Sequence, residues 1–289
     1  MEEHTLSPMQ EKLLAMFKDT VSFFEQYNLR YFVCGGTLLG TVRHHGFIPW
    51  DDDIDVYMYR EDYERLFTLN DEIERKGYYI QSLSEDGYYL SFAKIVDKSS
   101  TIWEKERFEH LTGVYIDVFP IDRFSYDDNA MVRNQIKARK LFRRYQTTIS
   151  KNATKRMLKY LCQFRFVTFW IALRSKFSDT AKKQYLQMFL DFEKSFTDNK
   201  GDKCVSLTTA KGCIFRCEWF DKMTDGIFET LDIKIPSGWH EYLTLLYGDY
   251  MTPPPKEKQV SVHHSIYVNL CERISLQEVK KRLKKENSR

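Results

Sequence analysis

Three aspartates spaced two residues apart are the part of this sequence best suited to chemistry. Asp51, Asp53 and Asp55 lie at the start of an expected strand, Asp53–Tyr57, whose Val56 is a β-branched residue of the kind that buried strands prefer. On an extended strand alternate side chains share a face, so the three aspartates would point the same way and Asp52 the other way. Like charges on one face repel unless a cation lies among them, and Mg²⁺ or Mn²⁺ prefers oxygen ligands. The spacing therefore predicts a strand that ends at a metal site.

A solvated surface turn and a calcium-binding loop are the alternatives for this aspartate cluster. A helix–loop–helix calcium loop would use Asp51, Asp53 and Asp55 as its first, third and fifth positions. Its sixth position should be glycine and its twelfth glutamate, but Val56 and Asp62 stand there. The pattern therefore favours a catalytic metal site over a calcium loop.

A pair of glycines precedes the aspartates. Gly35 and Gly36 lie between an expected buried strand, Tyr31–Cys34, and an expected helix, Thr37–Arg43. Glycine lets a phosphate approach the backbone, and a helix N-terminus offers free N–H groups and a positive dipole end. We therefore expect phosphate to be bound by Gly35, Gly36 and Thr37. Arg43 would either reach the phosphate too or lie solvated at the end of the helix, where a cation interacts favourably with the dipole.

Two further charged residues lie within apolar strand patterns. Asp117 interrupts the expected strand Val114–Phe119, where a buried carboxylate needs a partner. A shared metal is one partner, and an arginine or backbone N–H groups are the alternative. Lys94 lies in the expected strand Leu90–Val96. It would either contact phosphate or extend its ammonium group to solvent.

These segments resemble the signature of the LicD family. Gly35 to Val56 reads Gly-Gly-Thr-Leu-Leu-Gly-Thr-Val-Arg-His-His-Gly-Phe-Ile-Pro-Trp-Asp-Asp-Asp-Ile-Asp-Val, and Val114 to Ile121 resembles the family's second acidic strand. The segment Ile235 to Met251 is similar to a third, tyrosine-rich family segment. The family comprises bacterial phosphocholine transferases, with fukutin and fukutin-related protein as animal relatives. The resemblance spans residues 30–265, with a poorly matching middle.

The resemblance implies an α+β fold, with a nucleotidyltransferase-like mixed sheet flanked by helices. It also implies transfer of phosphocholine from CDP-choline, or of a related group from another CDP-alcohol, to a sugar hydroxyl of a glycan. Asp53 and Asp55 would bind Mg²⁺ or Mn²⁺, Asp51 would support them, and Asp117 would be a further ligand or accept the acceptor's proton. Nucleotidyl transfer to a small hydroxyl acceptor and a non-catalytic cation- or carbohydrate-binding module are the alternative functions.

Composition limits the partners and the compartment. The 289 residues carry a net charge of only +3, so we expect no nucleic-acid partner. The acidic, polar start of the chain is not a signal peptide, and the six cysteines are scattered without a Cys-x-x-Cys motif. We therefore expect free thiols and a cytoplasmic protein. Zinc binding by Cys204, Cys213 and Cys217 is an alternative that their irregular spacing disfavours.

Helices and strands should divide the chain into three parts. Residues 1–128 should form the catalytic core, residues 129–200 an inserted helical subdomain, and residues 201–289 the end of the core and a basic terminal helix. The expected helices of the core begin at the capping box Ser7–Gln10 and cover Glu61–Lys76 and Gly238–Tyr247. Further strands are expected at Tyr78–Ser82, Thr101–Trp103, Val205–Leu207 and Phe228–Ile235.

Residues 155–176 are aromatic and are basic at both ends. Gln163 and Arg165 interrupt the apolar run, so it is unsuited to crossing a bilayer. In one interpretation the segment is a helix buried against the inserted subdomain. In the other it makes peripheral contact with a membrane through Phe164, Phe169 and Trp170, which would suit a lipid-linked glycan acceptor.

Overall fold

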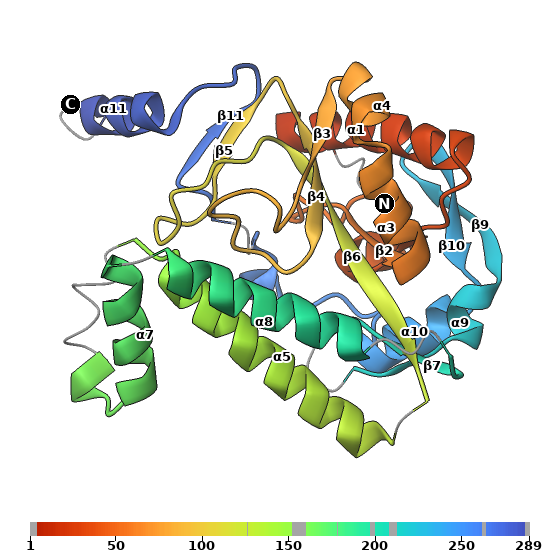
Figure 1. Ribbon diagram of the computed structural model, residues 1–289. Helices are drawn as coiled ribbons and strands as arrows, with labels where there is room; N and C mark the ends of the chain where they lie inside the picture. Colours follow the sequence, from red (N-terminus) through yellow and green to blue (C-terminus); the bar gives the residue numbers. More distant parts are fainter. Residues whose placement is uncertain are drawn as a thin grey trace.

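A curled mixed sheet with helices around it forms the centre of the molecule (Figure 1). The computed structural model describes residues 5–125, 127–151, 160–177, 179–196, 200–207, 213–261 and 264–286. Five strands follow one another in the order β1 (Phe32–Val33), β2 (Asp55–Tyr59), β6 (Tyr115–Phe124), β4 (Ala93–Asp97) and β3 (Tyr78–Gln81). The remaining two, β7 (Lys203–Val205) and β8 (Phe215–Arg216), extend the sheet from the far end of β6.

The sheet is mixed because one neighbouring pair of strands is parallel. Strands β2 and β6 run parallel, whereas β1 with β2, β4 with β6 and β3 with β4 are antiparallel. This confirms the expected α+β class with a mixed sheet and flanking helices. Strand β6 is longer than expected, because its last residues, Asp122 to Phe124, pair with β7.

Helix α1 (Pro8–Gln26) begins at the predicted capping box. The Ser7 side chain accepts a hydrogen bond from the Gln10 backbone, and the Gln10 side chain accepts one from the Ser7 backbone. Helix α2 (Gly35–His44) includes the two glycines that we expected before the helix. The single helix expected over residues 61–76 is instead two, α3 (Arg60–Thr68) and α4 (Asn70–Arg75), separated at Leu69.

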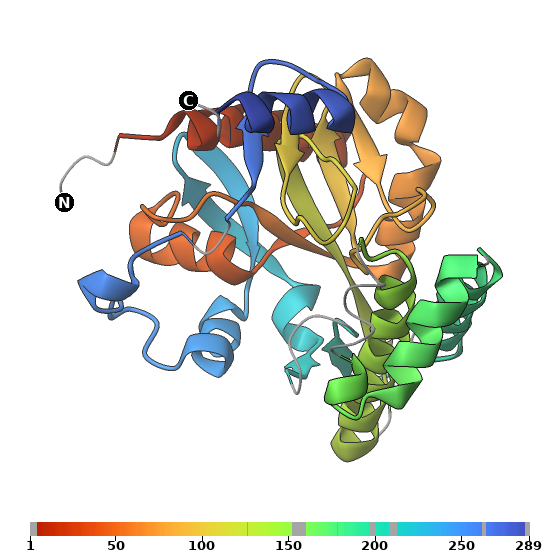
Figure 2. The ribbon, with the colours of Figure 1, turned by 90° about the vertical axis from the view of Figure 1, so that its left-hand side faces the viewer.

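Helices lie between β6 and β7 along the chain, and three of them have bounds given by the described residues. They are α5 (Asp128–Thr148), α7 (Phe166–Phe177) and α8 (Thr180–Phe196), and α5 and α8 pack lengthwise against each other (Figures 1 and 2). Buried residues of α5 and α8, including Phe142 and Phe189, form a second apolar core with Phe124 and Val205 of the sheet. The boundaries at residues 128 and 200 remain predictions.

The C-terminal part contains a hairpin where we expected one strand over residues 228–235. The turn at Glu229, with φ of +55°, separates β9 (Met223–Phe228) from β10 (Leu231–Pro236). The chain continues with α10 (Trp239–Tyr247), a 3-10 turn (Lys256–Lys258), β11 (Tyr267–Asn269), which pairs with β5 (Thr101–Trp103), and α11 (Leu276–Glu286). A short helix, α9 (Glu218–Asp221), precedes the hairpin. In the described part of the chain, no helix has the length and apolar character needed to cross a membrane.

Candidate functional site

Two aspartates from distant parts of the sequence lie opposite each other at the start of β2. Asp55 pairs in register with Asp117 on the parallel neighbour β6, and the Asp117 N–H donates to the Ile54 carbonyl at 2.9 Å. Both carboxylates are held at this position by the backbone ladder of the sheet. The structure thus brings together the two acidic segments that the sequence singled out separately.

The other aspartates of the cluster lie in the loop that leads into β2. Strand β2 begins at Asp55, so Asp51 and Asp53 are not on a regular strand, and the strand expected from Asp53 was placed too early. Asp51 Oδ2 lies so close to Gly36 that a Cβ there would collide with it. The Asp52 side chain instead accepts a hydrogen bond from Ser261. Asp52 therefore has a different environment from its neighbours, as expected, although a loop and not strand alternation is the cause.

The carboxylates of the cluster repel each other in a buried environment. Burial, followed by the charges of Asp53, Asp117 and Asp51, raises the pKa of Asp55 well above its usual value. Burial also raises the pKa of Asp117 to about 7, because it outweighs the opposing effect of Lys94. Without a bound cation, this cluster therefore holds more negative charge than its protein surroundings compensate.

Lys94 is the cation that faces this cluster. It lies opposite Asp117 on β4, is only 2% exposed, and places Nζ 3.2 Å from Asp117 Oδ1 and 3.3 Å from Glu104 Oε1. Its ammonium group therefore does not extend to solvent, and phosphate contact by Lys94 remains a prediction. Glu104 also accepts hydrogen bonds from the hydroxyls of Tyr89 and Tyr115. Sequence reasoning missed Glu104, because nothing in its local sequence indicates that it faces Lys94.

The N-terminus of α2 lies beside the carboxylates. Gly35 adopts a φ of +54°, which favours glycine, and its N–H donates to the Tyr242 hydroxyl at 3.1 Å. Thr37 Oγ1 accepts the Asp55 N–H at 2.8 Å and so ties the helix to β2. Within the part of the chain that the structure describes, the N–H groups of Gly36 and Thr37 donate to no protein acceptor. These two groups are available to an anion, as expected of a helix N-terminus.

Segment 235–251 packs on this helix and supplies residues that we did not assign individually. Besides Tyr242, it contributes the Tyr250 carbonyl, which accepts a hydrogen bond from Arg43. Partial burial raises the pKa of Tyr247, and the charges of Asp55, Asp51 and Asp53 add to this effect, which shows that Tyr247 lies near the cluster. Arg43 is held by Tyr250 and by His44, so its contact with phosphate remains a prediction.

The oxygen donors of the site match a hard divalent cation in chemical type. Asp117 Oδ1 is buried with the Lys94 ammonium group 3.2 Å away, and Asp55 is repelled by its acidic neighbours. In their described positions, however, no three His, Cys, Asp or Glu side chains converge closely enough to hold a metal ion. A cation would therefore relieve the repulsion, and its binding would require the carboxylates to move together.

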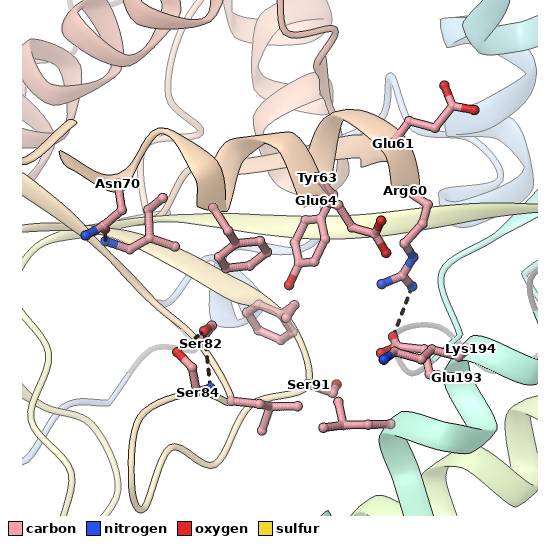
Figure 3. A pocket seen from close by; sticks show the side chains of 15 residues that line it. Arg60, Glu61, Tyr63, Glu64, Asn70, Ser82, Ser84, Ser91, Glu193 and Lys194 are labelled. Atoms are coloured by element: carbon pink, nitrogen blue, oxygen red, sulfur yellow. Dashed lines mark hydrogen bonds and ion pairs between the residues drawn. The ribbon is translucent and has the colours of Figure 1, made fainter. Parts of the chain in front are cut away.

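A pocket of about 760 Å³ lies apart from this cluster (Figure 3). It is lined by α3, α8 and the ends of β3 and β4, and Arg60 points across it toward Glu193. Arg60 also forms two hydrogen bonds with Asp122, at 2.8 and 2.7 Å. Asp122 and Asp117 are an odd number of residues apart on β6, so their side chains face opposite sides of the sheet. The pocket therefore marks the junction between the core and α8, and not the carboxylate site.

Comparisons with known proteins find similarity along most of the chain. The profile of the LicD/FKTN/FKRP nucleotidyltransferase domain matches residues 28–172. The lipopolysaccharide cholinephosphotransferase LicD of Haemophilus influenzae is 28% identical over 271 residues, which cover 91% of this chain and 97% of that protein. An uncharacterized protein of Rickettsia prowazekii is 33% identical over 40% of this chain and 42% of its own length. The human ribitol 5-phosphate transferase FKRP is 34% identical over 29% of this chain and 14% of its own length.

Proposed function

The chain belongs to the LicD/FKTN/FKRP nucleotidyltransferase family, and on that premise we propose that it transfers phosphocholine from CDP-choline to a sugar hydroxyl of a surface glycan. The observation that supports this most is the pairing of Asp55 with Asp117 beside the free N–H groups of α2. Acidic and anion-binding groups then face one position, as transfer of a phosphorus group requires.

Residues of this chain would divide the chemistry among them. The N–H groups of Gly36 and Thr37 would bind the donor's phosphate oxygens. Asp51, Asp53, Asp55 and Asp117 would hold Mg²⁺ or Mn²⁺, which when bound neutralises phosphate oxygens and stabilises the leaving group.

The reaction forms a bond between the acceptor oxygen and the phosphorus of phosphocholine and breaks the bridging bond to CMP. We assign the proton of the acceptor hydroxyl to Asp117 Oδ1, a buried carboxylate oxygen of the residue that pairs with Asp55. Lys94, 3.2 Å from that oxygen, would keep the carboxylate positioned. The adjacent Glu104 would in turn hold Lys94.

A panel of activated donors tests the proposal. The protein is incubated with CDP-choline, CDP-ribitol or CDP-glycerol, with Mg²⁺ and with lipopolysaccharide oligosaccharide as the hydroxyl acceptor, and released CMP is measured. We expect CMP from CDP-choline above the other two donors. CMP from CDP-ribitol alone would keep the reaction and correct the alcohol. Release of pyrophosphate from CTP with no CMP from any CDP-alcohol would overturn the proposal in favour of nucleotidyl transfer.

A further inference from the structure

Helix α7 and the turn before it expose a cluster of large apolar side chains. Phe164 is 81% exposed, and Phe166, Val167 and Trp170 are 53%, 62% and 59% exposed. The other side of α7 is buried, with Ile171 at 3%. We call the exposed residues the apolar patch. Soluble surfaces rarely gather four large apolar side chains in one short segment, so the apolar patch calls for a partner.

The backbone at Phe164 reinforces this conclusion. Its φ of +53° is a conformation that side chains other than glycine, asparagine and aspartate rarely adopt. A phenylalanine there gains no burial within the described structure, because its ring is largely in solvent. Among the described residues, the Phe164 ring therefore adds nothing to the core.

The basic side chains of α5 and α7 have no acidic partner among the described residues. Helix α5 carries six of them, and α7 and its preceding turn add Arg165 and Arg174. None forms an ion pair with an acidic residue in the described ranges, unlike Lys182, which pairs with Asp86. The six on α5 are Arg133, Lys137, Arg139, Lys140, Arg143 and Arg144. Positive charge therefore accumulates on these helices without neutralisation.

The asymmetry extends over the whole region between β6 and β7. Residues 129–200 contain 17 of the chain's 44 Lys and Arg but only 4 of its 41 Asp and Glu. The rest of the chain is therefore acidic, although the whole has a net charge of only +3. Lys155, Arg156 and Lys159 belong to this count but lie outside the described residues. The segment that carries the apolar patch thus has a large excess of basic over acidic residues, and the terminal helix α11 is a second basic part of the chain.

We propose that α5 and α7 dock the protein onto an anionic phospholipid surface, with the apolar patch in the headgroup region. Exposed aromatic residues beside unpaired Lys and Arg match the two components of such a surface, apolar chains and anionic headgroups. Figure 1 shows α7 at the edge of the molecule, beside the ends of α5 and α8 and away from the mixed sheet. The contact would be peripheral, because α7 has only 12 residues. Phe169, which the sequence placed at the membrane, is only partly exposed and is not included in the patch.

Vesicle cosedimentation tests this proposal without any activity measurement. Wild-type protein is mixed with phosphatidylcholine vesicles, with or without phosphatidylglycerol, at low salt and at about 1 M salt, where screening reduces the Debye length to about 3 Å. We expect sedimentation with the phosphatidylglycerol vesicles at low salt only. The double variant Phe164→Asn/Trp170→Gln should bind about tenfold or more weakly. Asparagine tolerates the positive φ at position 164, so this variant should keep the wild-type Tm.

A second variant removes charge from α5. Arg133→Gln/Lys140→Gln/Arg143→Gln changes exposed residues and spares Lys137, which lies over the Phe192 ring. It should also bind about tenfold or more weakly. Two controls should bind as the wild type does. Ile227→Gln changes an apolar residue that is 55% exposed on β9, and Lys281→Gln/Lys284→Gln/Lys285→Gln removes the same charge from α11.

Three results would overturn the proposal. The first is wild-type protein that stays in the supernatant with phosphatidylglycerol vesicles at low salt. The second is an α11 variant that loses as much binding as the α5 variant, which would mean diffuse electrostatic attraction. The third is sedimentation velocity showing a dimer that the apolar-patch variant abolishes, with no vesicle binding. If the double variant has a lowered Tm, quenching of Trp fluorescence by brominated lipid in the wild type decides, and absence of quenching excludes insertion of Trp170.

Discussion

Asp55 is the residue whose carboxylate is most directly repelled by the other acidic groups of the site. Burial and three acidic neighbours raise its pKa well above the usual value. Asp55→Asn removes one charge while keeping the side-chain shape. We therefore expect the Tm in the absence of divalent metal to rise by a few degrees. Thermal unfolding in a chelator-containing buffer measures this.

The matched control for this prediction is Asp52→Asn, which changes the neighbouring side chain that accepts a hydrogen bond from Ser261. It should not raise the Tm. Millimolar Mg²⁺ should raise the Tm of the wild type more than that of Asp55→Asn, by linkage. An unchanged or lower Tm of Asp55→Asn without metal would contradict the account of a repulsive cluster.

Lys94 should be essential for stability because it compensates two buried carboxylates. Lys94→Met leaves Asp117 and Glu104 without their cation, so we expect a loss of about 3–5 kcal/mol in the free energy of unfolding. Denaturant unfolding measures it. Lys98→Met is the control, because the Lys98–Glu74 pair is exposed and should contribute about 1 kcal/mol or less. Equal losses in the two variants would show that the ion pairs of Lys94 stabilise the fold no more than the exposed Lys98–Glu74 pair does.

His110 makes the folded state sensitive to acid. Burial lowers its pKa to about 4, below the value of about 6.5 in an unfolded chain. The unfolded state therefore binds the proton first, and stability is lost as the pH falls from about 6.5 to about 4. His110→Gln should flatten the stability profile in this window by about 2–3 kcal/mol, whereas the exposed His264→Gln should not. Parallel stability profiles of the wild type and His110→Gln would refute this.

Glu85 faces His110, and burial raises its pKa, so its titration changes the stability in the opposite direction. The contribution of His110 is therefore read from the difference between the wild-type and His110→Gln profiles.

Among the secondary-structure elements, α3 and α8 are joined by one buried arginine. Arg60 is bonded to Asp122 of β6, which is fully buried, and to Glu193 of α8 (Figure 3). Asp122→Ala should cost about 3–5 kcal/mol in the free energy of unfolding, because it leaves a buried cation with a single partner. Denaturant unfolding measures this, with Asp221→Ala of the exposed Arg123 pair as the control, expected to cost about 1 kcal/mol or less. A loss no larger than the control's would mean that Arg60 does not join α8 to the core.

Local sequence signals predicted several elements well and others poorly. The capping box of α1 and the strand Thr101–Trp103 were predicted because their signals are local. The hairpin of β9 and β10 was missed because its turn lies at Glu229, which is not a typical turn residue for a positive φ. Strand β11 was missed because its pairing with β5 joins residues far apart in the sequence.

The candidate site, too, could be predicted only in part from the sequence. Asp55 was selected because it belongs to a cluster of aspartates two residues apart, and Asp117 because a carboxylate within an apolar strand is unusual. The parallel pairing of β2 and β6 brings the two together. The partners of Lys94 could not be read from local patterns, because Glu104 reaches it only through the three-dimensional fold. The same holds for Tyr242, whose hydroxyl accepts the N–H of Gly35.

At the scale of the whole molecule, the candidate active site combines three segments of one chain. Residues 34–55 supply the helix N-terminus and the first carboxylates, β6 supplies Asp117, and residues 235–251 cover α2 through Tyr242 and Tyr250. The basic helices α5 and α7 lie outside this assembly and carry Lys and Arg side chains that form no ion pair with the described residues. Separate surfaces for chemistry and for docking would let vesicle binding and turnover be changed independently.

The most direct test of the central claim is the rate of CMP release by carboxylate variants. The wild type, Asp117→Asn and Asp52→Asn are compared with the CDP-alcohol that gives the most CMP, at saturating Mg²⁺, after circular dichroism confirms that each is folded. We predict that Asp117→Asn lowers the rate by about 100-fold or more, whereas Asp52→Asn stays within about threefold of the wild type. A folded Asp117→Asn protein that releases CMP at nearly the wild-type rate would contradict the assignment of catalysis to the Asp55–Asp117 cluster.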